Sequence, residues 1–447
     1  MDGRQETLQR FLMLAVTVML LGGCDTVKSW FKEEEIPPLP GDRISVLLHA
    51  QTLAPDPMFA TERILLPRPT VNPNWPQAGG YANHAMHHIA VADRLSRAWQ
   101  TDIGEGVDDA ERFVSSPIVA RGQVFAMDTG TNVSAFDAET GGRLWEIELT
   151  PEDEDEGHIS GGVAYENGRV VVTTGFGQVI ALDAGTGVEV WRRDVGSPMR
   201  TPPTLRGGRV FAVTVNNKLN VLDATNGDTL WTHAGMAEAA SILGGGSPAV
   251  DASVVVVPYS SGELVALKVE NGRVLWTDSL AAVKRTDVVS TLAHIRGRPI
   301  IDRGRVIALS HGGLMVAIDL RSGLRLWSKE IGGLESPWVV GDYIYIMSND
   351  GELICLSRDD GNIYWVRPLP RWEDPRNKRG PILWSGPILV SDRLIVAGSK
   401  GEALAISPYS GQILSRVEMP DNVSVAPIAA NGSVYILSDN AELAAYR

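Results

Sequence analysis

The chain has 447 residues, of which 44% are hydrophobic, and it carries 40 basic and 54 acidic side chains, a net charge of −14 at pH 7. Such an acidic surface does not favour binding to polyanions, so we expect no nucleic-acid partner. Motifs typical of phosphate-binding loops, serine hydrolases and zinc metalloproteases are absent from the sequence.

The first residues are typical of a secreted lipoprotein. Two arginines precede an apolar run from Phe11 to Leu21, which is too short to span a membrane, and the run ends in Leu21-Gly22-Gly23-Cys24. The motif resembles a bacterial lipobox, so we expect residues 1–23 to be a signal peptide and Cys24 to be acylated, for example with palmitate. An ordinary signal peptide with an incidental cysteine is the alternative. Asp25 resembles an enteric signal for retention at the inner membrane, which leaves open which membrane is occupied.

Residues 24–74 are interpreted as a lipid-anchored tether, because a Glu-rich stretch followed by Pro37, Pro38 and Pro40 is typical of solvated chain. The next segment contains aromatic residues, glycines and three histidines at positions 84, 87 and 88. Histidines this close could bind a metal ion. No carboxylate or thiolate pattern supports a metal, so a strand or loop packed on the folded domain is favoured.

From residue 117 the chain repeats one pattern: an apolar pair, usually an Asp, a turn ending in Gly, and a Trp four residues after that Gly. The Trp positions are Trp145, Trp191, Trp231, Trp276, Trp327 and Trp365, and a seventh copy has Ser415 instead. A proline lies 28 residues before most of these positions, at Pro117, Pro203, Pro248, Pro299, Pro337 and Pro387. A repeat of this length predicts a solenoid, a propeller or an array.

Each unit contains four short runs rich in Val, Ile and Leu, separated by turns such as Asn167-Gly168. These runs predict a four-stranded antiparallel sheet, which at this period is a propeller blade. We expect the turn Gly to adopt a positive φ, the preceding Asp to cap the turn, and the Trp to bury its ring between adjacent blades.

Counting units predicts an all-β fold of eight blades over residues 75–447. Seven units run from 117 to 415, and an eighth begins at Pro427 but ends at Arg447 before its last strand. Trp99 lies in an orphan last strand before the first complete unit. We therefore expect this N-terminal strand to close the ring against the three C-terminal strands.

The repeated carboxylates Asp137, Asp183, Asp223 and Asp319 are candidates for catalysis only at first sight. They recur at one turn position in successive units, so the fold distributes them around the ring instead of gathering them. Capping of the turns is the favoured interpretation.

These Asp, Gly and Trp repeats resemble the quinoprotein-type, or PQQ-like, propeller repeat, over roughly residues 75–447. This family includes pyrroloquinoline-quinone alcohol dehydrogenases and the BamB lipoproteins of the outer-membrane β-barrel assembly machine. The resemblance to the dehydrogenases implies a lid made of adjacent cysteines and a Ca²⁺ site, but this chain has only Cys24 and Cys355. We therefore expect no enzyme activity, no cofactor and no metal.

The connections between units vary from 10 to 23 residues and are all expected on one face of the ring, which is the predicted binding surface. The resemblance to BamB implies that loops 232–247 and 277–298 contact a periplasmic domain of the partner BamA. The residues implied at this contact are Ile242, Leu243, Arg285, Leu292 and His294.

The predicted function is that of a non-enzymatic scaffold lipoprotein in β-barrel assembly, anchored in the outer membrane and facing the periplasm. Its expected partners are BamA, other assembly subunits and, by edge pairing, unfolded outer-membrane proteins. Two alternatives stay open: a quinoprotein-like dehydrogenase, and a propeller that binds or senses a small ligand at its axis.

Overall fold

The computed structural model describes residues 53–59, 62–108, 111–154, 159–238, 242–281 and 293–447. The chain divides into two units, 1–52 and 53–447, and the described residues belong to the second. They contain 34 strands in eight four-stranded sheets and one two-stranded hairpin. Within these ranges, no helix has the length and apolar character needed to cross a bilayer.

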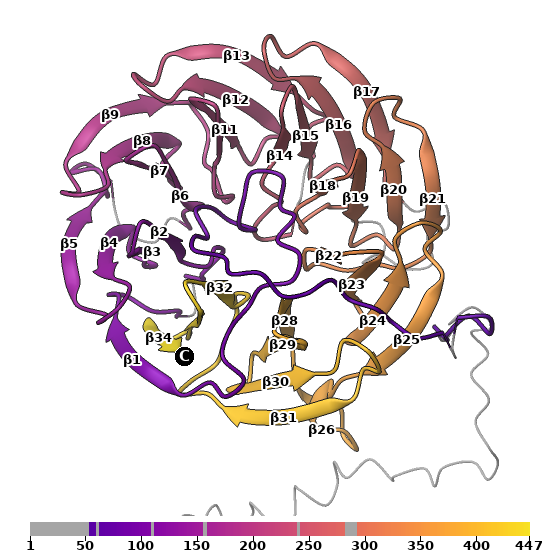
Figure 1. Cartoon of the computed structure of the whole chain (residues 1–447). Coiled ribbons are helices and arrows are strands. Elements are labelled where there is room, and N and C mark those ends of the chain that lie inside the picture. The colour runs from indigo at the N-terminus through magenta and orange to yellow at the C-terminus, as the bar shows by residue number, and fades with distance from the viewer. Residues whose placement is uncertain (1–52, 60–61, 109–110, 155–158, 239–241, 282–292) are drawn as a thin grey trace, which may run out of the picture. The chain divides into compact units, whose positions relative to one another are not determined.

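The sheets stand as blades around a central axis, with the first strand of each blade nearest the centre (Figure 1). Blades one to four are β2 (Ile118–Ala120), β3 (Gln123–Met127), β4 (Asn132–Asp137) and β5 (Arg143–Glu148); β6 (Gly162–Glu166), β7 (Arg169–Thr173), β8 (Gln178–Asp183) and β9 (Glu189–Asp194); β10 (Thr204–Arg206), β11 (Arg209–Val213), β12 (Lys218–Asp223) and β13 (Thr229–Ala234); and β14 (Ala249–Asp251), β15 (Val254–Pro258), β16 (Glu263–Lys268) and β17 (Val274–Ser279).

Blades five to seven are β18 (Ile300–Asp302), β19 (Arg305–Leu309), β20 (Met315–Asp319) and β21 (Arg325–Lys329); β22 (Trp338–Val340), β23 (Tyr343–Met347), β24 (Glu352–Ser357) and β25 (Ile363–Pro368); and β28 (Trp384–Val390), β29 (Arg393–Gly398), β30 (Glu402–Ile406) and β31 (Ile413–Glu418). A hairpin of β26 (Trp372–Asp374) and β27 (Arg379–Pro381) is inserted between blades six and seven.

Blade eight closes the ring as the sequence predicts. β32 (Ile428–Ala430), β33 (Ser433–Leu437) and β34 (Glu442–Tyr446) pair in order, and β1 (Arg97–Asp102) adds antiparallel to β34. Ser96 and Arg447 extend this pairing, each donating its backbone N–H to the other's carbonyl at 2.7 and 2.9 Å. The two distant parts of the chain therefore complete one blade, and the eight-bladed all-β prediction is confirmed.

The blades differ in burial from the centre outward. The middle strands are buried on both faces, as in β7, where four consecutive residues after Arg169 are buried. The outer strands alternate, and in β9 Trp191 is the buried residue among exposed neighbours. A continuous apolar run suits a strand covered on both sides, whereas alternation suits one facing solvent.

The outer-strand tryptophans join each blade to the next. Trp145 of blade one lies against Gly187 of blade two, and its Nε1–H donates to the carbonyl of Ala184 at 3.0 Å. The same contact and hydrogen bond recur at the other six Trp positions, with Gly141, Gly227, Gly272, Gly323, Gly361 and Gly411 as the glycines. The expected burial of these rings between blades is confirmed.

The repeated aspartates cap their turns. Asp183 Oδ1 accepts the N–H groups of Gly185 and Thr186, both at 3.1 Å, and the Thr186 hydroxyl at 2.9 Å. The Thr186 hydroxyl is the main cause that holds the pKa of Asp183 below its usual value. Asp137, Asp223 and Asp319 accept bonds at the same place in their own turns. Their structural role, expected from the repeat, is confirmed.

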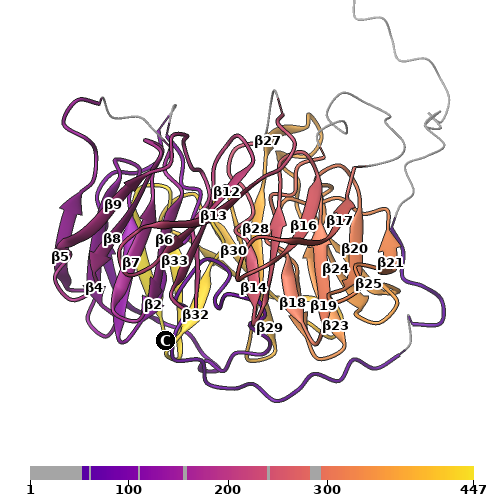
Figure 2. The ribbon, with the colours of Figure 1, turned by 90° about the horizontal axis from the view of Figure 1, so that it is seen from above.

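Residues 62–95, here called the N-terminal strap, run across the lower side of the ring (Figure 2). The strap hydrogen-bonds to all eight blades. Its first residues, 62–74, fall within the range that is predicted to be a tether. Its partners are Val119, Tyr165, Leu205, Val250, Ile301, Trp338, Leu389 with Ser391, and Asn431, in blade order. The strap is thus a common support for the inner strands of all eight blades.

Candidate functional site

The connections between blades rise on the upper side of the ring, opposite the strap (Figure 2). This is the face on which the varying loops were expected. Of the two loops singled out, the structure describes 232–238, 242–247, 277–281 and 293–298. Arg285 and Leu292 lie outside the described residues, as do Cys24 and Asp25, so predictions about them stay predictions.

A cleft of about 400 Å³ opens beside blades three and four, and we call it the blade-three groove. Val213, Val215, Ile242 and Pro258 supply its apolar side chains. Its polar lining residues are Arg200, Thr201, Thr214, Asn217, Ser260 and His294. Two of the five predicted partner-binding residues, Ile242 and His294, therefore come together here, and Leu243 directly follows Ile242.

His294 is a buried support of this groove, only 3% exposed. Its Nδ1 accepts the backbone N–H of Ile242 at 3.1 Å, so the ring proton sits on Nε2. Burial, aided by the positive charge of Arg296, lowers the pKa of His294 to about 4. A neutral histidine thus holds loop 242–247 in place, whereas Ile242 and Leu243 are half-exposed.

Two exposed apolar residues beside the groove were not singled out from the sequence. Val215 is 39% exposed and Met236 is 57% exposed. Asn217 ties them together, because it follows Val215 in the same turn and donates its Nδ2–H to the carbonyl of Met236 at 2.6 Å. The sequence does distinguish Val215. In the turn between the second and third strands, the other seven blades have Thr, Gly, Ser, His, Asn or Asp at the equivalent position.

Residues 368–384 form a basic insertion between blades six and seven, and part of this insertion contacts the propeller. Arg371 pairs with Asp350 at 3.2 Å, and Lys400 pairs with Glu373 at 3.3 Å. The buried Trp384 donates its Nε1–H to the carbonyl of Pro370 at 2.9 Å. These contacts pack the base of the insertion on the propeller, whereas Arg376, Lys378 and Arg379 are exposed and form no ion pair with described residues.

The three histidines of the strap bind separate partners. His84 Nδ1 lies 2.7 Å from the carbonyl oxygen of Pro299, and His88 Nδ1 lies 2.6 Å from that of Pro67. His87 Nε2 is 3.6 Å from a carboxylate oxygen of Asp302. Among the residues described, no three His, Cys, Asp or Glu side chains are grouped to hold a metal ion. The strap packs on the propeller, as the favoured interpretation states.

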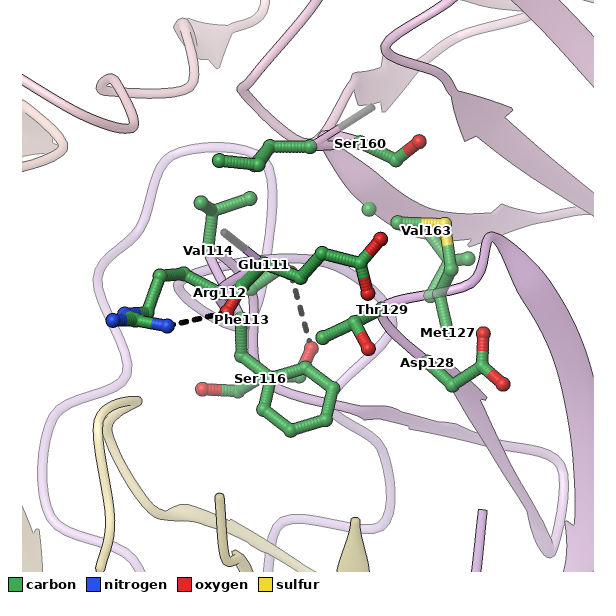
Figure 3. A pocket seen from close by; sticks show the side chains of 13 residues that line it. Glu111, Arg112, Phe113, Val114, Ser116, Met127, Asp128, Thr129, Ser160 and Val163 are labelled. Carbon is green, nitrogen blue, oxygen red and sulfur yellow. Dashed lines mark hydrogen bonds between the residues drawn. The ribbon is translucent and has the colours of Figure 1, made fainter. Parts of the chain in front are cut away.

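A pocket of about 380 Å³ lies between blades one and two (Figure 3). Burial raises the pKa of Asp128, yet both its carboxylate oxygens are occupied by Asn132 and the N–H of Glu105. The Ser160 hydroxyl bonds to Thr131 and to the N–H of Gly175. The polar groups of this pocket therefore hold loops in place and do not form a nucleophile and base.

The sequence matches the family of outer membrane protein assembly factor BamB over residues 96–160 and 129–367. The chain belongs to the BamB family. Outer membrane protein assembly factor BamB of Yersinia pestis is 29% identical over 302 residues, which are 66% of this chain and 76% of that protein.

Solved structures share the fold of this BamB-family chain. BamB from Moraxella catarrhalis superposes with a TM-score of 0.67 at 21% identity, covering 79% of this chain and 100% of that one. Quinohemoprotein alcohol dehydrogenase from Comamonas testosteroni gives a TM-score of 0.64 at 15% identity, covering 84% and 80%. At these identities the likeness shows the propeller fold alone.

The described residues of this BamB-family chain contain one cysteine, Cys355, which is a core residue. It is fully buried in β24, and burial raises the pKa of its thiol. With Cys24 as the one other cysteine of the chain, the adjacent pair expected of the dehydrogenases cannot form.

Proposed function

We propose that this protein is a non-enzymatic scaffold in the assembly of outer-membrane β-barrel proteins, and that it binds BamA through the blade-three groove. Membership of the BamB family supports the assembly role. The observation that carries the binding site is a group of apolar side chains on the face with the varying loops. Val215 and Met236 are exposed, and Ile242 and Leu243 are half-exposed. Exposed apolar groups beside polar ones are typical of protein contact surfaces.

The mechanism is association, with no covalent bond made or broken. Side chains held by a rigid backbone lose little conformational freedom on binding, which favours affinity. The carbonyl of Met236 accepts a hydrogen bond from Asn217 Nδ2, and the N–H of Met236 donates to the carboxylate of Glu263 at 2.7 Å. The N–H of Ile242 donates to His294 Nδ1. We assign His294 a positioning role, and we propose Arg285 and Leu292 as further contacts.

Leu243→Asp tests this surface, because it places a charge in the apolar contact without altering the core. The tagged protein is used to pull down BamA from detergent-solubilised envelopes, and its thermal unfolding is measured in parallel. We expect BamA recovery to be lost and the melting temperature to be nearly unchanged. Leu144→Asp, at an exposed residue of β5, is the matched control and should retain BamA.

Unchanged recovery of BamA by the Leu243→Asp protein would contradict the proposed patch while leaving the assembly role intact. Recovery of a cytochrome or a dehydrogenase subunit by the wild-type protein, instead of BamA, would contradict the assembly role itself.

We also propose that Cys24 carries the lipid anchor and that the protein faces the periplasm from the outer membrane. Cys24→Ser should abolish incorporation of labelled palmitate and release the protein from the membrane fraction. Separation of the inner and outer membranes then tests the role of Asp25. If the wild-type protein is found in the inner membrane and the Asp25→Ser protein moves to the outer membrane, the proposed outer-membrane location is contradicted.

A further inference from the structure

Two adjoining cavities occupy the axis of the propeller, with volumes of about 440 and 530 Å³. Both are lined by Ser116, Arg298, Glu335, Ser336 and Ala426, which come from the entrances of blades one, five, six and eight. The strap forms part of the second cavity through Trp75, Ala78, Gly79 and His84. Groups far apart in the sequence therefore converge at one place on the axis.

The repeat makes one lining residue stand out. The position just before the unit-opening proline, or before Val163 in blade two, is small in six blades: Ser116, Gly162, Ser247, Ser336, Gly386 and Ala426. Blade three has Pro202 there, and blade five has Arg298. Since repeat-related residues occupy equivalent places around the ring, Arg298 is a single long cation in a ring of short side chains.

Arg298 forms no direct ion pair with a described carboxylate, although the nearby charge of Glu335 acts to raise the pKa of its guanidinium. Its Nη1 donates to the hydroxyl of Ser336 at 3.3 Å, and its Nε has no hydrogen-bond partner. The nearby Glu335 is engaged elsewhere, with Arg296 at 3.3 Å and with the N–H of Gly386 at 3.2 Å. No carboxylate in the described chain lies within ion-pair distance of Arg298. A half-buried guanidinium in this state favours an anion beside it.

Two more polar atoms in the same cavity lack partners. Trp75 and His84 are 4% and 6% exposed, and Trp75 Nε1 and His84 Nε2 are both unpaired. His84 Nδ1 is 2.7 Å from the carbonyl of Pro299 and must donate to it, so Nε2 is an acceptor. The unpaired atoms of this cavity are thus donors on Arg298 and Trp75 and one acceptor on His84. The Glu335 carboxylate also lines the cavity, and its two oxygens are bonded to Arg296 and to the N–H of Gly386.

The strap approaches Arg298 closely at Gly79. This residue has φ +79°, and a Cβ placed on it would lie 2.8 Å from His84 Cδ2 and 3.1 Å from Arg298 Cδ. The two side chains therefore flank one glycine. Trp75 stacks on Trp338 with ring centroids 6.2 Å apart, which gives the cavity an aromatic wall.

We propose that the axial cavity binds a small organic carboxylate that also carries a hydroxyl group, with Arg298 and Trp75 donating to the carboxylate and His84 accepting from the hydroxyl. Arg298, Trp75 and His84 do not line the blade-three groove, although Gly245 lines both that groove and the smaller axial cavity, and the proposal does not depend on the BamA contact. No reaction is implied, because the ligand is held by hydrogen bonds and charge alone.

The test uses the purified full chain and the matched probes glycolate and acetate, which differ by one hydroxyl. Binding is measured by calorimetry and by the shift of the melting temperature, at constant ionic strength with chloride as the reference. We expect saturable glycolate binding, with acetate weaker, and a loss of about tenfold or more in affinity in Arg298→Gln. Arg206→Gln removes an exposed arginine of blade three and should leave binding unchanged.

Absence of saturable binding to the wild-type protein, or equal binding by the Arg298→Gln protein, would overturn the site. If Arg298→Gln does not fold, a crystal of the wild-type protein soaked in glycolate decides the question. Density for the carboxylate beside Arg298 supports the proposal, and density for water alone overturns it. Pull-down of BamA is a separate measurement, so failure of one proposal is distinguished from failure of the other.

Discussion

The indole of Trp191 in blade two lies on Gly227 of blade three, so closely that a Cβ on that glycine would be 2.6 Å from the ring. The same indole donates its Nε1–H to Ala224 at 3.0 Å. Trp191 therefore does not dock on Gly187, the glycine that lies four residues before it in the sequence; Gly187 contacts Trp145 instead. Each Trp docks on the Gly of the following blade, and seven such contacts join the ring.

Gly227→Ala should destabilise the protein by more than its backbone strain alone. Gly227 has φ +73°, and the added methyl group would clash with Trp191. The control Gly168→Ala has a similar φ of +82° but open space around the new Cβ. We expect about 1 to 2 kcal/mol from the positive φ in both proteins and about 1 to 3 kcal/mol more in Gly227→Ala from overpacking. Denaturant unfolding of both variants measures the difference, and equal losses would contradict the docking.

Trp191→Ala and Ser415→Trp should have unequal effects on stability. Removing the buried indole of Trp191 should lower the free energy of unfolding by about 3 to 5 kcal/mol.

Ser415 is exposed, and blade eight offers it no turn glycine because β34 and β1 belong to opposite ends of the folded chain. Ser415→Trp should therefore change stability by less than about 0.5 kcal/mol. A clear rise in the denaturation midpoint of the Ser415→Trp protein would contradict this expectation, because it would show that blade eight has a site on which the new indole packs.

Stability should fall as the pH is lowered from about 6.5 to 4, in part through His294. The pKa of His294 is lowered to about 4 in the folded protein, so in this window the unfolded chain binds a proton that the folded chain does not. The free energy of unfolding should lose up to about 1.4 kcal/mol per pH unit from this residue. His294→Gln should reduce the slope by that amount. An identical slope in the variant, measured by urea unfolding across the window, would exclude the effect.

Gln77→Ala tests the strap as a support for the blades. The buried Gln77 donates to the carbonyl of Leu205 at 3.3 Å and accepts its N–H at 2.8 Å. Truncation leaves both backbone groups unpaired, which should cost about 2 to 5 kcal/mol. Asn74→Ala is the control, because Asn74 accepts one bond from the exposed Arg121 N–H at 3.0 Å and should cost about 1 kcal/mol or less. Similar losses in the two variants, measured by thermal unfolding, would argue against a special role for the strap.

The candidate site was predictable only in part. Unequal loop lengths identified the correct face for the varying connections, and the apolar Ile242 and Leu243 lie beside a groove on it. The burial of His294 was not predictable, because its environment is made by loop 242–247 and by Arg296 and His311. Val215 could have been found by comparing the same turn in all eight blades, since it is the apolar member of that set.

The sequence by itself determined the blades, their number and the closure by β1, because strand periodicity, turn glycines and the Trp spacing are local and recur in every unit. Only the tertiary structure decided which residues meet across units. The strap has no period, and its partners lie in all eight blades. The repeat also predicts that each Trp is buried between blades, but only the closed ring shows that its partner is the turn Gly of the following blade. The cavity in which Arg298 meets Trp75 and His84 likewise appears only in the structure. The contacts of the strap leave no pattern along the chain, because they are set by how the blades are arranged in space.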